Sequence, residues 1–165
     1  MSEITVRPAG PDDTGAVAAA GLPWSTPGAT VVVCHDTTYD TATLPRLVAV
    51  RGGTVAGVLA YAVDGDALEV VAIETTAPRT GAGTALLTAA YELAAVRGLT
   101  RVWLVTTNDN LDALRFYQRR GMRLVAVDPG AVDRARRVKP AIPRTGSYGI
   151  DLHDELHLEH RLDVR

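Results

Sequence analysis

A short glycine-containing segment carries the clearest signal for ligand binding in this sequence. Residues 79–84 read Arg-Thr-Gly-Ala-Gly-Thr and lie between a strand-like apolar run and a helix-like one. Glycine lets a backbone approach a ligand closely, and the amides at a helix start, together with the helix dipole, favour a phosphate group. Arg79 would add a charge-assisted contact. A purely structural glycine turn is the alternative, whereas a nucleotide P-loop is excluded because the Gly-Lys-Ser/Thr ending is missing.

The elements before this turn follow from the alternation of apolar residues. Residues 3–8 alternate as a strand, Asp12 and Asp13 open a short Ala-rich helix, and residues 21–30 form a loop. Three strand-like segments then follow one another, joined by tight turns that contain glycine. They lie at residues 47–50, 55–63 and 68–73. This pattern predicts an antiparallel meander.

Helices and strands alternate after the turn. Residues 81–97 place apolar side chains on one helical face, and Gly98 ends the helix. The remaining predicted elements are a strand at 102–105, a helix at 110–120, a strand at 124–127, a long connection at 128–152 and a strand at 156–162. This order is typical of a mixed α/β (α+β) protein.

The composition restricts the class of protein. A length of 165 residues suits one compact domain, so residues 1–165 are predicted to form a single domain. No apolar run approaches the roughly 18 residues that span a bilayer, and the N-terminus does not have the pattern of a secretory signal. We therefore expect a cytoplasmic protein. The net charge of -2 gives no general attraction to nucleic acid or acidic membranes, and Cys34, the only cysteine, excludes an intramolecular disulfide.

The order of the elements and two local motifs resemble the GCN5-related N-acetyltransferase (GNAT) family. The resemblance covers roughly residues 3–127, and its specific part is residues 69–122. The family's helix motif, Asn-x-x-Ala-x-x-Phe/Leu-Tyr-x-x-x-Gly-Phe, is matched by Asn110, Ala113, Tyr117 and Gly121. The sequence departs from the family at two positions. Pro78 stands at the family's first Gln or Arg, which leaves Arg79 one place late, and Met122 replaces the usual Phe.

The resemblance implies a GNAT fold, with a mixed, mostly antiparallel sheet of six to seven strands flanked by helices and a splay between the fourth and fifth strands. It also implies acetyl-CoA as co-substrate, with its diphosphate on the amides of the glycine turn and its pantetheine arm paired to the strand before it. Asn110 would contact the pantetheine or cap its own helix. The coenzyme-binding residues implied are Val71, Ile73, Arg79, Thr80, Gly81, Ala82, Gly83, Thr84 and Asn110. No metal is implied.

Transfer to an amine makes a base useful, because an alkylammonium ion has no lone pair with which to attack a thioester. Glu69 interrupts an apolar strand and resembles the strand-four Glu of the histone-acetylating members. It is therefore the first candidate for the base, acting directly or through water. The alternative is that Glu69 is simply an outward-facing residue of its strand. Glu74 is the reserve candidate, or else a loop-capping carboxylate. A strand amide at the splay would stabilise the oxyanion. The resemblance implies that Tyr117 is the general acid, because the family has a tyrosine hydroxyl at this point of the helix; a core aromatic is the alternative.

Three further groups of residues have weaker claims. The histidines at 153, 157 and 160 lie close together, but the leucines around them alternate as in a strand, so we predict that they bind no metal. His153, Asp154 and Glu155 would instead border an acceptor pocket. The basic residues between 134 and 144 are interpreted as a solvated face, with binding of an acidic acceptor or of the coenzyme's 3′-phosphate as the alternative. Trp24 either lines the acceptor site or anchors its loop.

We therefore predict an acetyl-CoA-dependent N-acetyltransferase that acts by direct transfer in a ternary complex. The acceptor would be a small-molecule or peptide amine, which the sequence does not identify. The alternative is a non-catalytic acyl-CoA-binding sensor or regulatory module. Membrane and nucleic-acid partners are not expected, and a homodimer is left open.

Overall fold

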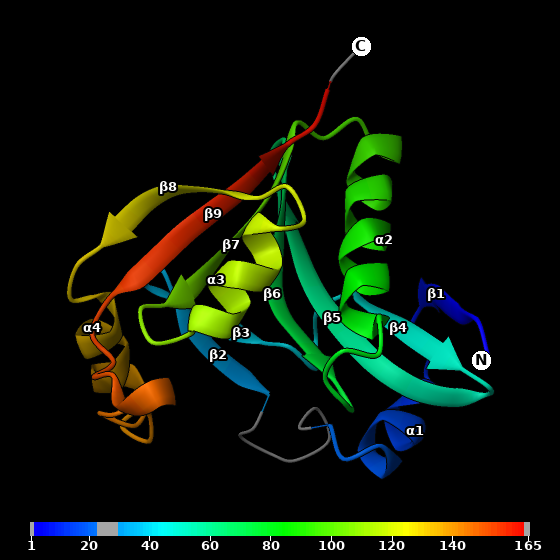
Figure 1. Ribbon diagram of the computed structural model, residues 1–165, viewed down its shortest axis with the longest axis horizontal. Helices are drawn as coiled ribbons and strands as arrows, with labels where there is room; N and C mark the ends of the chain where they lie inside the picture. Colours follow the sequence, from blue (N-terminus) through cyan, green and yellow to red (C-terminus); the bar gives the residue numbers. More distant parts are fainter. Residues whose placement is uncertain (1, 23–29, 164–165) are drawn as a thin grey trace. The chain divides into compact units, whose positions relative to one another are not determined.

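The computed structural model describes residues 2–22 and 30–163, and contacts within the chain define two compact units. The first unit comprises Met1–Val32, Tyr39–Val102 and Leu162–Arg165. The second unit comprises Val33–Thr38 and Trp103–Arg161. Figure 1 labels the elements of both. A single domain over residues 1–165 remains a prediction.

Four antiparallel strands form the sheet of the first unit, and they are the predicted N-terminal strand and meander. Their order in the sheet is β1 (Ile4–Pro8), β4 (Arg46–Arg51), β5 (Thr54–Asp64) and β6 (Ala67–Thr75). The turn between β4 and β5 has φ values of 56° at Gly52 and 78° at Gly53. Positive φ at both positions is what a two-residue hairpin turn requires, which explains the glycine pair.

Different helices cover the two faces of this sheet. Val58 and Ala60 of β5 belong to a buried cluster with Val17 of α1 (Asp13–Ala19). Gly57 points to the other face, where an added Cβ would lie 3.0 Å from Leu86 Cδ1 of α2 (Ala82–Val96). Since successive strand residues point to opposite faces, α1 and α2 lie on opposite sides of the sheet. The missing side chain at Gly57 allows α2 to pack close against β5.

The second unit contains three strands and two α-helices. The strands lie in the order β7 (Arg101–Thr107), β9 (Glu155–Arg161) and β8 (Arg123–Asp128), and β8 and β9 are antiparallel. The first two residues of β7 belong to the first unit. The helices are α3 (Leu111–Gln118) and α4 (Ala131–Val138).

Two segments differ from the sequence prediction. Residues 128–152, expected to be a long connection, contain α4 and the 3-10 turn η2 (Ser147–Gly149). The helix was not predicted because Pro129 and Gly130 are typical of a loop. In the structure Gly130 is the N-cap of α4, with φ 77°. The hairpin of β2 (Val31–Cys34) and β3 (Thr37–Asp40) was also not predicted. Its turn takes positive φ at His35 and Asp36, so no glycine marks it.

The predicted fold class is confirmed. The protein is a mixed α/β protein whose main strands are mostly antiparallel, four in the first unit and three in the second. The predicted splay concerns β6 and β7 and remains a prediction. Within residues 2–22 and 30–163, no helix combines the length and the apolar character needed to cross a membrane.

Candidate functional site

The glycine turn of residues 79–84 leads into the first turn of α2. Arg79 has φ 60° and Gly81 has φ 86°, so two left-handed residues flank Thr80. The left-handed conformation costs a non-glycine residue such as Arg79 about 1–2 kcal/mol. Gly81 is the N-cap of α2 and has no side chain with which to cap the helix, while Ala82 is fully buried. The amides of the first turn are therefore those expected to hold an anion, because no N-cap side chain competes for them.

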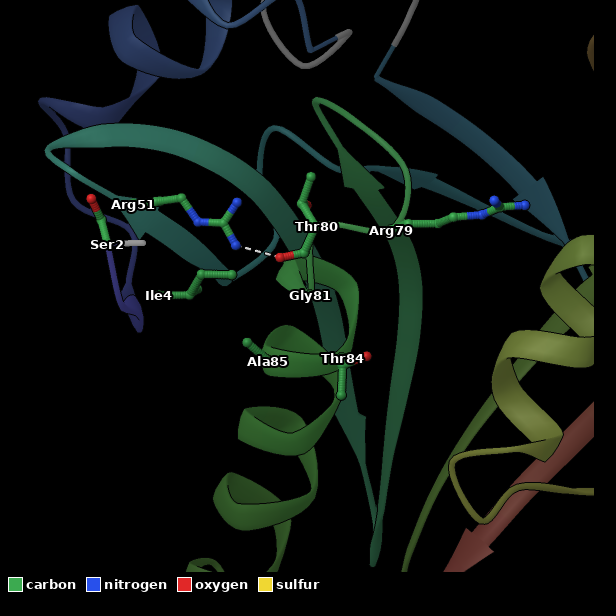
Figure 2. Close-up of a pocket in the computed structure, with 8 residues that line it drawn as sticks. All are labelled: Ser2, Ile4, Arg51, Arg79, Thr80, Gly81, Thr84 and Ala85. Carbon is green, nitrogen blue, oxygen red and sulfur yellow. Dashed lines mark hydrogen bonds between the residues drawn. The ribbon is translucent and has the colours of Figure 1, made fainter.

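Arg51 contacts this turn from the end of β4. Its Nη2 donates a hydrogen bond to the main-chain carbonyl of Thr80, and its Nε is buried. Figure 2 shows the Arg51 side chain reaching the turn from one side, whereas the Arg79 side chain extends from the turn to the opposite side. The two arginines therefore lie on different sides of the same backbone.

An open hollow of about 750 Å³ borders the turn. Figure 2 shows the residues that line it. Its lining residues are Ser2, Ile4, Arg51, Arg79, Thr80, Gly81, Thr84 and Ala85. The Thr80 carbonyl points to the Arg51 side, so here the turn offers an acceptor and not a donor. A diphosphate needs N–H donors, and the Arg79 side chain, which extends to the opposite side of the turn, is such a donor.

β6 contains a β-bulge at Val71. Val70 lies opposite Tyr61 and Ala72 lies opposite Ala60, so Val71 is an extra residue without an opposite residue on β5. A bulge disrupts the hydrogen-bond ladder locally, and bulges are frequent beside active sites. Val71 was predicted to pair with the coenzyme through its main chain. The bulge takes this residue out of the β5–β6 ladder.

The bulge also decides which way the two candidate bases face. Glu69 lies opposite Ala62 and Glu74 lies opposite Val58, and these two β5 residues point to the same face. Opposite residues in a ladder share a face. Glu69 and Glu74 therefore both point to the face that α1 covers, although their spacing of five residues would separate them in a regular strand.

The two glutamates have different surroundings. Glu69 is 4% exposed, and its Oε2 accepts a hydrogen bond of 2.7 Å from the Tyr39 hydroxyl. The interpretation of Glu69 as an outward-facing residue is therefore wrong, because β6 is buried on both faces over residues 67–70. Glu74 is exposed as a whole residue, yet desolvation by nearby protein atoms raises the pKa of its carboxyl group. Ile73, between them, is half-buried.

Tyr117 and Asn110 lie on α3, in the second unit. Tyr117 is 7% exposed and its ring makes an edge contact with Phe116 at 5.3 Å. Asn110 is the N-cap of α3: its Oδ1 accepts from the Ala113 amide at 3.4 Å, and its Nδ2 donates to Thr106 Oγ1 at 3.1 Å. The capping role of Asn110 is confirmed, and its contact with a coenzyme remains a prediction.

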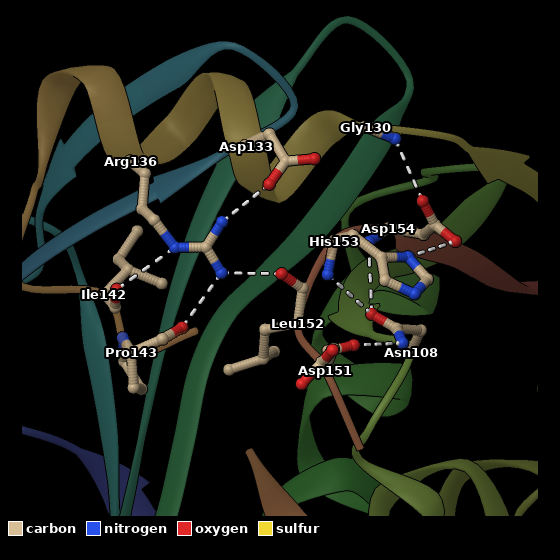
Figure 3. Close-up of polar contacts among 10 residues, drawn as sticks. All are labelled: Asn108, Gly130, Asp133, Arg136, Ile142, Pro143, Asp151, Leu152, His153 and Asp154. Carbon is tan, nitrogen blue, oxygen red and sulfur yellow. Dashed lines mark hydrogen bonds and ion pairs between the residues drawn. The ribbon is translucent and has the colours of Figure 1, made fainter. Parts of the chain in front are cut away.

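A polar network anchors the segment between β8 and β9, as Figure 3 shows. Arg136 donates to the carbonyls of Ile142, Pro143 and Leu152 at 2.6–3.2 Å and pairs with Asp133 at 2.7 Å. The predicted basic face is thus partly structural, since Arg134 also pairs with Asp36 and Asp128.

Asp154 and Glu155, near the start of β9, have different hydrogen-bond partners and opposite pKa shifts. Asp154 accepts from the Gly130 amide at 2.9 Å and pairs with His153 Nδ1 at 2.6 Å. These two contacts, the amide first, lower the pKa of Asp154. Glu155 is 3% exposed and accepts from the His35 amide at 2.9 Å. Burial is the larger effect there and raises the pKa of Glu155.

The three C-terminal histidines do not share one site. His153 pairs with Asp154, the His157 ring stacks on Trp103 at 6.2 Å, and His160 Nδ1 lies 3.1 Å from the Gly121 carbonyl oxygen. The strand β9 replaces the helix that a metal-binding pair would need. Trp24, the other acceptor-site candidate, lies outside the described residues.

The sequence analysis did not identify Tyr39 and Arg51 as parts of the site. Tyr39 reaches Glu69 across 30 residues and Arg51 reaches Thr80 across 29. Neither residue lies in a motif, and contacts across such separations leave no local pattern. The sequence position of Arg51 at a hairpin turn indicates only that its strand ends there.

Comparisons with known proteins agree with this geometry. The model of the "Acetyltransferase (GNAT) family" matches residues 18–122. The uncharacterized protein YdhI of Bacillus subtilis (strain 168) is 40% identical over 113 residues, which cover 68% of this chain and 71% of that protein.

Two solved structures are similar in fold. One is a GNAT family acetyltransferase from Elizabethkingia anophelis with acetyl-CoA bound, with a TM-score of 0.71 and 17% identity over 96% of this chain and 98% of that one. The other is an IAA acetyltransferase from Bacillus cereus ATCC 14579, with a TM-score of 0.70 and 21% identity over 97% of this chain and 100% of that one.

Proposed function

This chain belongs to the acetyltransferase (GNAT) family, and on that premise we propose that it transfers the acetyl group of acetyl-CoA to a primary amine. The observation that carries the proposal is the left-handed Gly81 turn at the start of α2, whose N-cap residue has no side chain with which to cap the helix. Together with Arg79 this turn has the chemistry that a diphosphate needs. The location that we propose remains the cytoplasm.

The bulge in β6 supports a role for Val71 in the transfer step. Attack of an amine on a thioester carbonyl develops negative charge on the carbonyl oxygen, and a fixed main-chain N–H is a suitable donor. Val71 stands outside the β5–β6 ladder. In the proposal its amide stabilises the oxyanion, and Ile73 binds the pantetheine arm through its main chain.

Glu69 acts as the base in this proposal, directly or through a water molecule, and removes the proton from the attacking ammonium. The Tyr39 hydroxyl bond at 2.7 Å holds the Glu69 carboxylate in one orientation. Tyr117 donates its hydroxyl proton to the departing thiolate. Proton transfers of this kind are typically worth about 10² to 10⁴ in rate.

The acceptor is proposed only as a class. A primary amine on a small molecule or on a peptide fits the reaction, and no residue of the described chain selects between them. A ternary complex suffices for direct transfer, because holding the amine beside the thioester supplies the effective concentration that the reaction needs.

A thiol-release assay with acetyl-CoA and a panel of small amines, amino acids, aminoglycosides and peptides tests the proposal. We expect turnover with at least one class of amine. Glu69→Gln and Tyr117→Phe should each lower kcat more than tenfold while the Kd for CoA, measured by calorimetry, stays within about threefold. Normal CoA binding without turnover on any acceptor would instead support the sensor, and stabilisation by ATP but not by acetyl-CoA would contradict both functions.

A further inference from the structure

Arg51 joins the turn of residues 79–84 to a rigid part of the sheet. It is the last residue of β4, and it is paired on both sides, with Ile4 of β1 and Thr54 of β5. Its guanidinium donates to the Thr80 carbonyl oxygen. Its Nε is buried and has no hydrogen-bond partner within the described residues. The contact is therefore held by a strand, not by a mobile loop.

The contact fixes the orientation of one peptide group. Thr80 stands between two left-handed residues, Arg79 and Gly81, so its peptide to Gly81 is the central one of the turn. In a trans peptide the C=O and the following N–H point in opposite directions. A guanidinium that holds the Thr80 oxygen on the β4 side therefore directs the Gly81 N–H to the other side, toward which the Arg79 side chain extends (Figure 2).

We infer that Arg51 is a positioning residue for coenzyme binding, which holds the Thr80 carbonyl and thereby aims the Gly81 amide at the diphosphate. The inference rests on the proposed function. Arg51 itself does not touch the coenzyme, since it lies on the carbonyl side of the turn. Arg51 is therefore expected to affect the binding of acetyl-CoA and not of the amine, and to act only on the binding of the diphosphate group.

Two acetyl donors separate this role from a merely structural one. Acetyl-CoA carries the diphosphate, and S-acetylpantetheine has the same thioester and pantetheine arm without it. We expect Arg51→Met, which keeps the aliphatic stem but removes the donor, to raise the KM for acetyl-CoA about tenfold with kcat within twofold. The kcat/KM for S-acetylpantetheine should not change. Arg51→Lys keeps a donor and should recover most of the acetyl-CoA affinity. Arg123→Met, on the exposed strand β8, is the matched control and should resemble the wild type.

A second measurement needs no coenzyme. The Gly81 amide should shift in an ¹⁵N-correlated NMR spectrum of Arg51→Met, while Arg51→Lys and Arg123→Met leave it near its wild-type position. Equal losses with both donors, or an unchanged Gly81 amide in Arg51→Met, would overturn the inference. Failure of the wild type to bind CoA, with the Gly81 amide still responding to Arg51→Met, would overturn the proposed function and leave the positioning of the turn supported.

Discussion

Glu69 and Glu74 face the same side of β6, but among the described residues a hydrogen bond from a neighbouring side chain is seen for Glu69 only. The Tyr39 hydroxyl bond orients its carboxylate, whereas Glu74 stands near the end of the strand and is exposed. A base that must act repeatedly on one position benefits from such orientation. We therefore keep Glu69 as the base and Glu74 as the reserve.

The pH dependence of the single variants distinguishes the two. A base must be deprotonated, and desolvation raises the pKa of Glu74, so a rate that depended on Glu74 would rise with pH through a value above that of an ordinary glutamate. We expect Glu74→Gln to keep kcat within about threefold and to keep the acidic limb of the kcat/KM profile. Glu69→Gln should instead lower kcat more than tenfold. The reverse pattern would make Glu74 the base.

The raised pKa of Glu155 predicts that the free energy of unfolding depends on pH. Burial raises its pKa in the folded state, so its contribution to stability is complete below the unfolded pKa of about 4.3 and is lost as the pH rises through the folded value. Glu155→Gln keeps an oxygen that accepts from the His35 amide but does not titrate. The free energy of unfolding of Glu155→Gln, relative to the wild type, should increase between pH 4 and pH 8 in urea titrations. A constant difference would show that this carboxyl group titrates alike in both states.

At the scale of elements, the packing of α2 on β5 depends on one missing side chain. A Cβ at position 57 would lie 3.0 Å from the Glu74 carbonyl oxygen and 3.0 Å from Leu86 Cδ1. The carbonyl belongs to the backbone of β6 and cannot rotate away. Gly57→Ala should therefore lower the free energy of unfolding by about 1–3 kcal/mol, measured by denaturant titration.

Gly15 provides the control for this change. It lies within α1, and an added Cβ there would meet nothing within 4 Å. Alanine has the higher helix propensity, so Gly15→Ala should stabilise the protein by up to about 1 kcal/mol. Equal effects of the two substitutions would contradict the close packing at position 57.

Most elements could be predicted because their signals are local. The meander, α2 and α3 have strong alternation or helical spacing, and glycines mark their ends, so the predicted and observed ranges differ by few residues. The hairpin β2–β3 was not predicted because the residues with positive φ in its turn are His35 and Asp36, not glycines. Helix α4 was not predicted because Pro129 and Gly130 are typical of a loop. The Tyr39 and Arg51 contacts escaped because they depend on tertiary structure alone.

At the scale of the whole molecule, coenzyme binding should be visible as stability. A ligand that binds only the folded state stabilises it by about 2.7 kcal/mol at a hundredfold excess over Kd. For a chain of this length that raises Tm by roughly 5–10 °C. We expect this shift with acetyl-CoA or CoA in differential scanning fluorimetry and none with ATP. A shift with ATP alone would contradict the assignment of the glycine turn to coenzyme A.

The additional residue in β6 also fixes how this strand can be compared between relatives. With Val71 deleted, the carboxylates now numbered 69 and 74 would be four residues apart, so a regular strand without the bulge would still turn both to one face. A strand that kept all the residues but lost the bulge would instead turn them to opposite faces. A one-residue gap at Val71 in an alignment of relatives should therefore be interpreted as loss of the bulge, with the two acids still on the same side of the sheet.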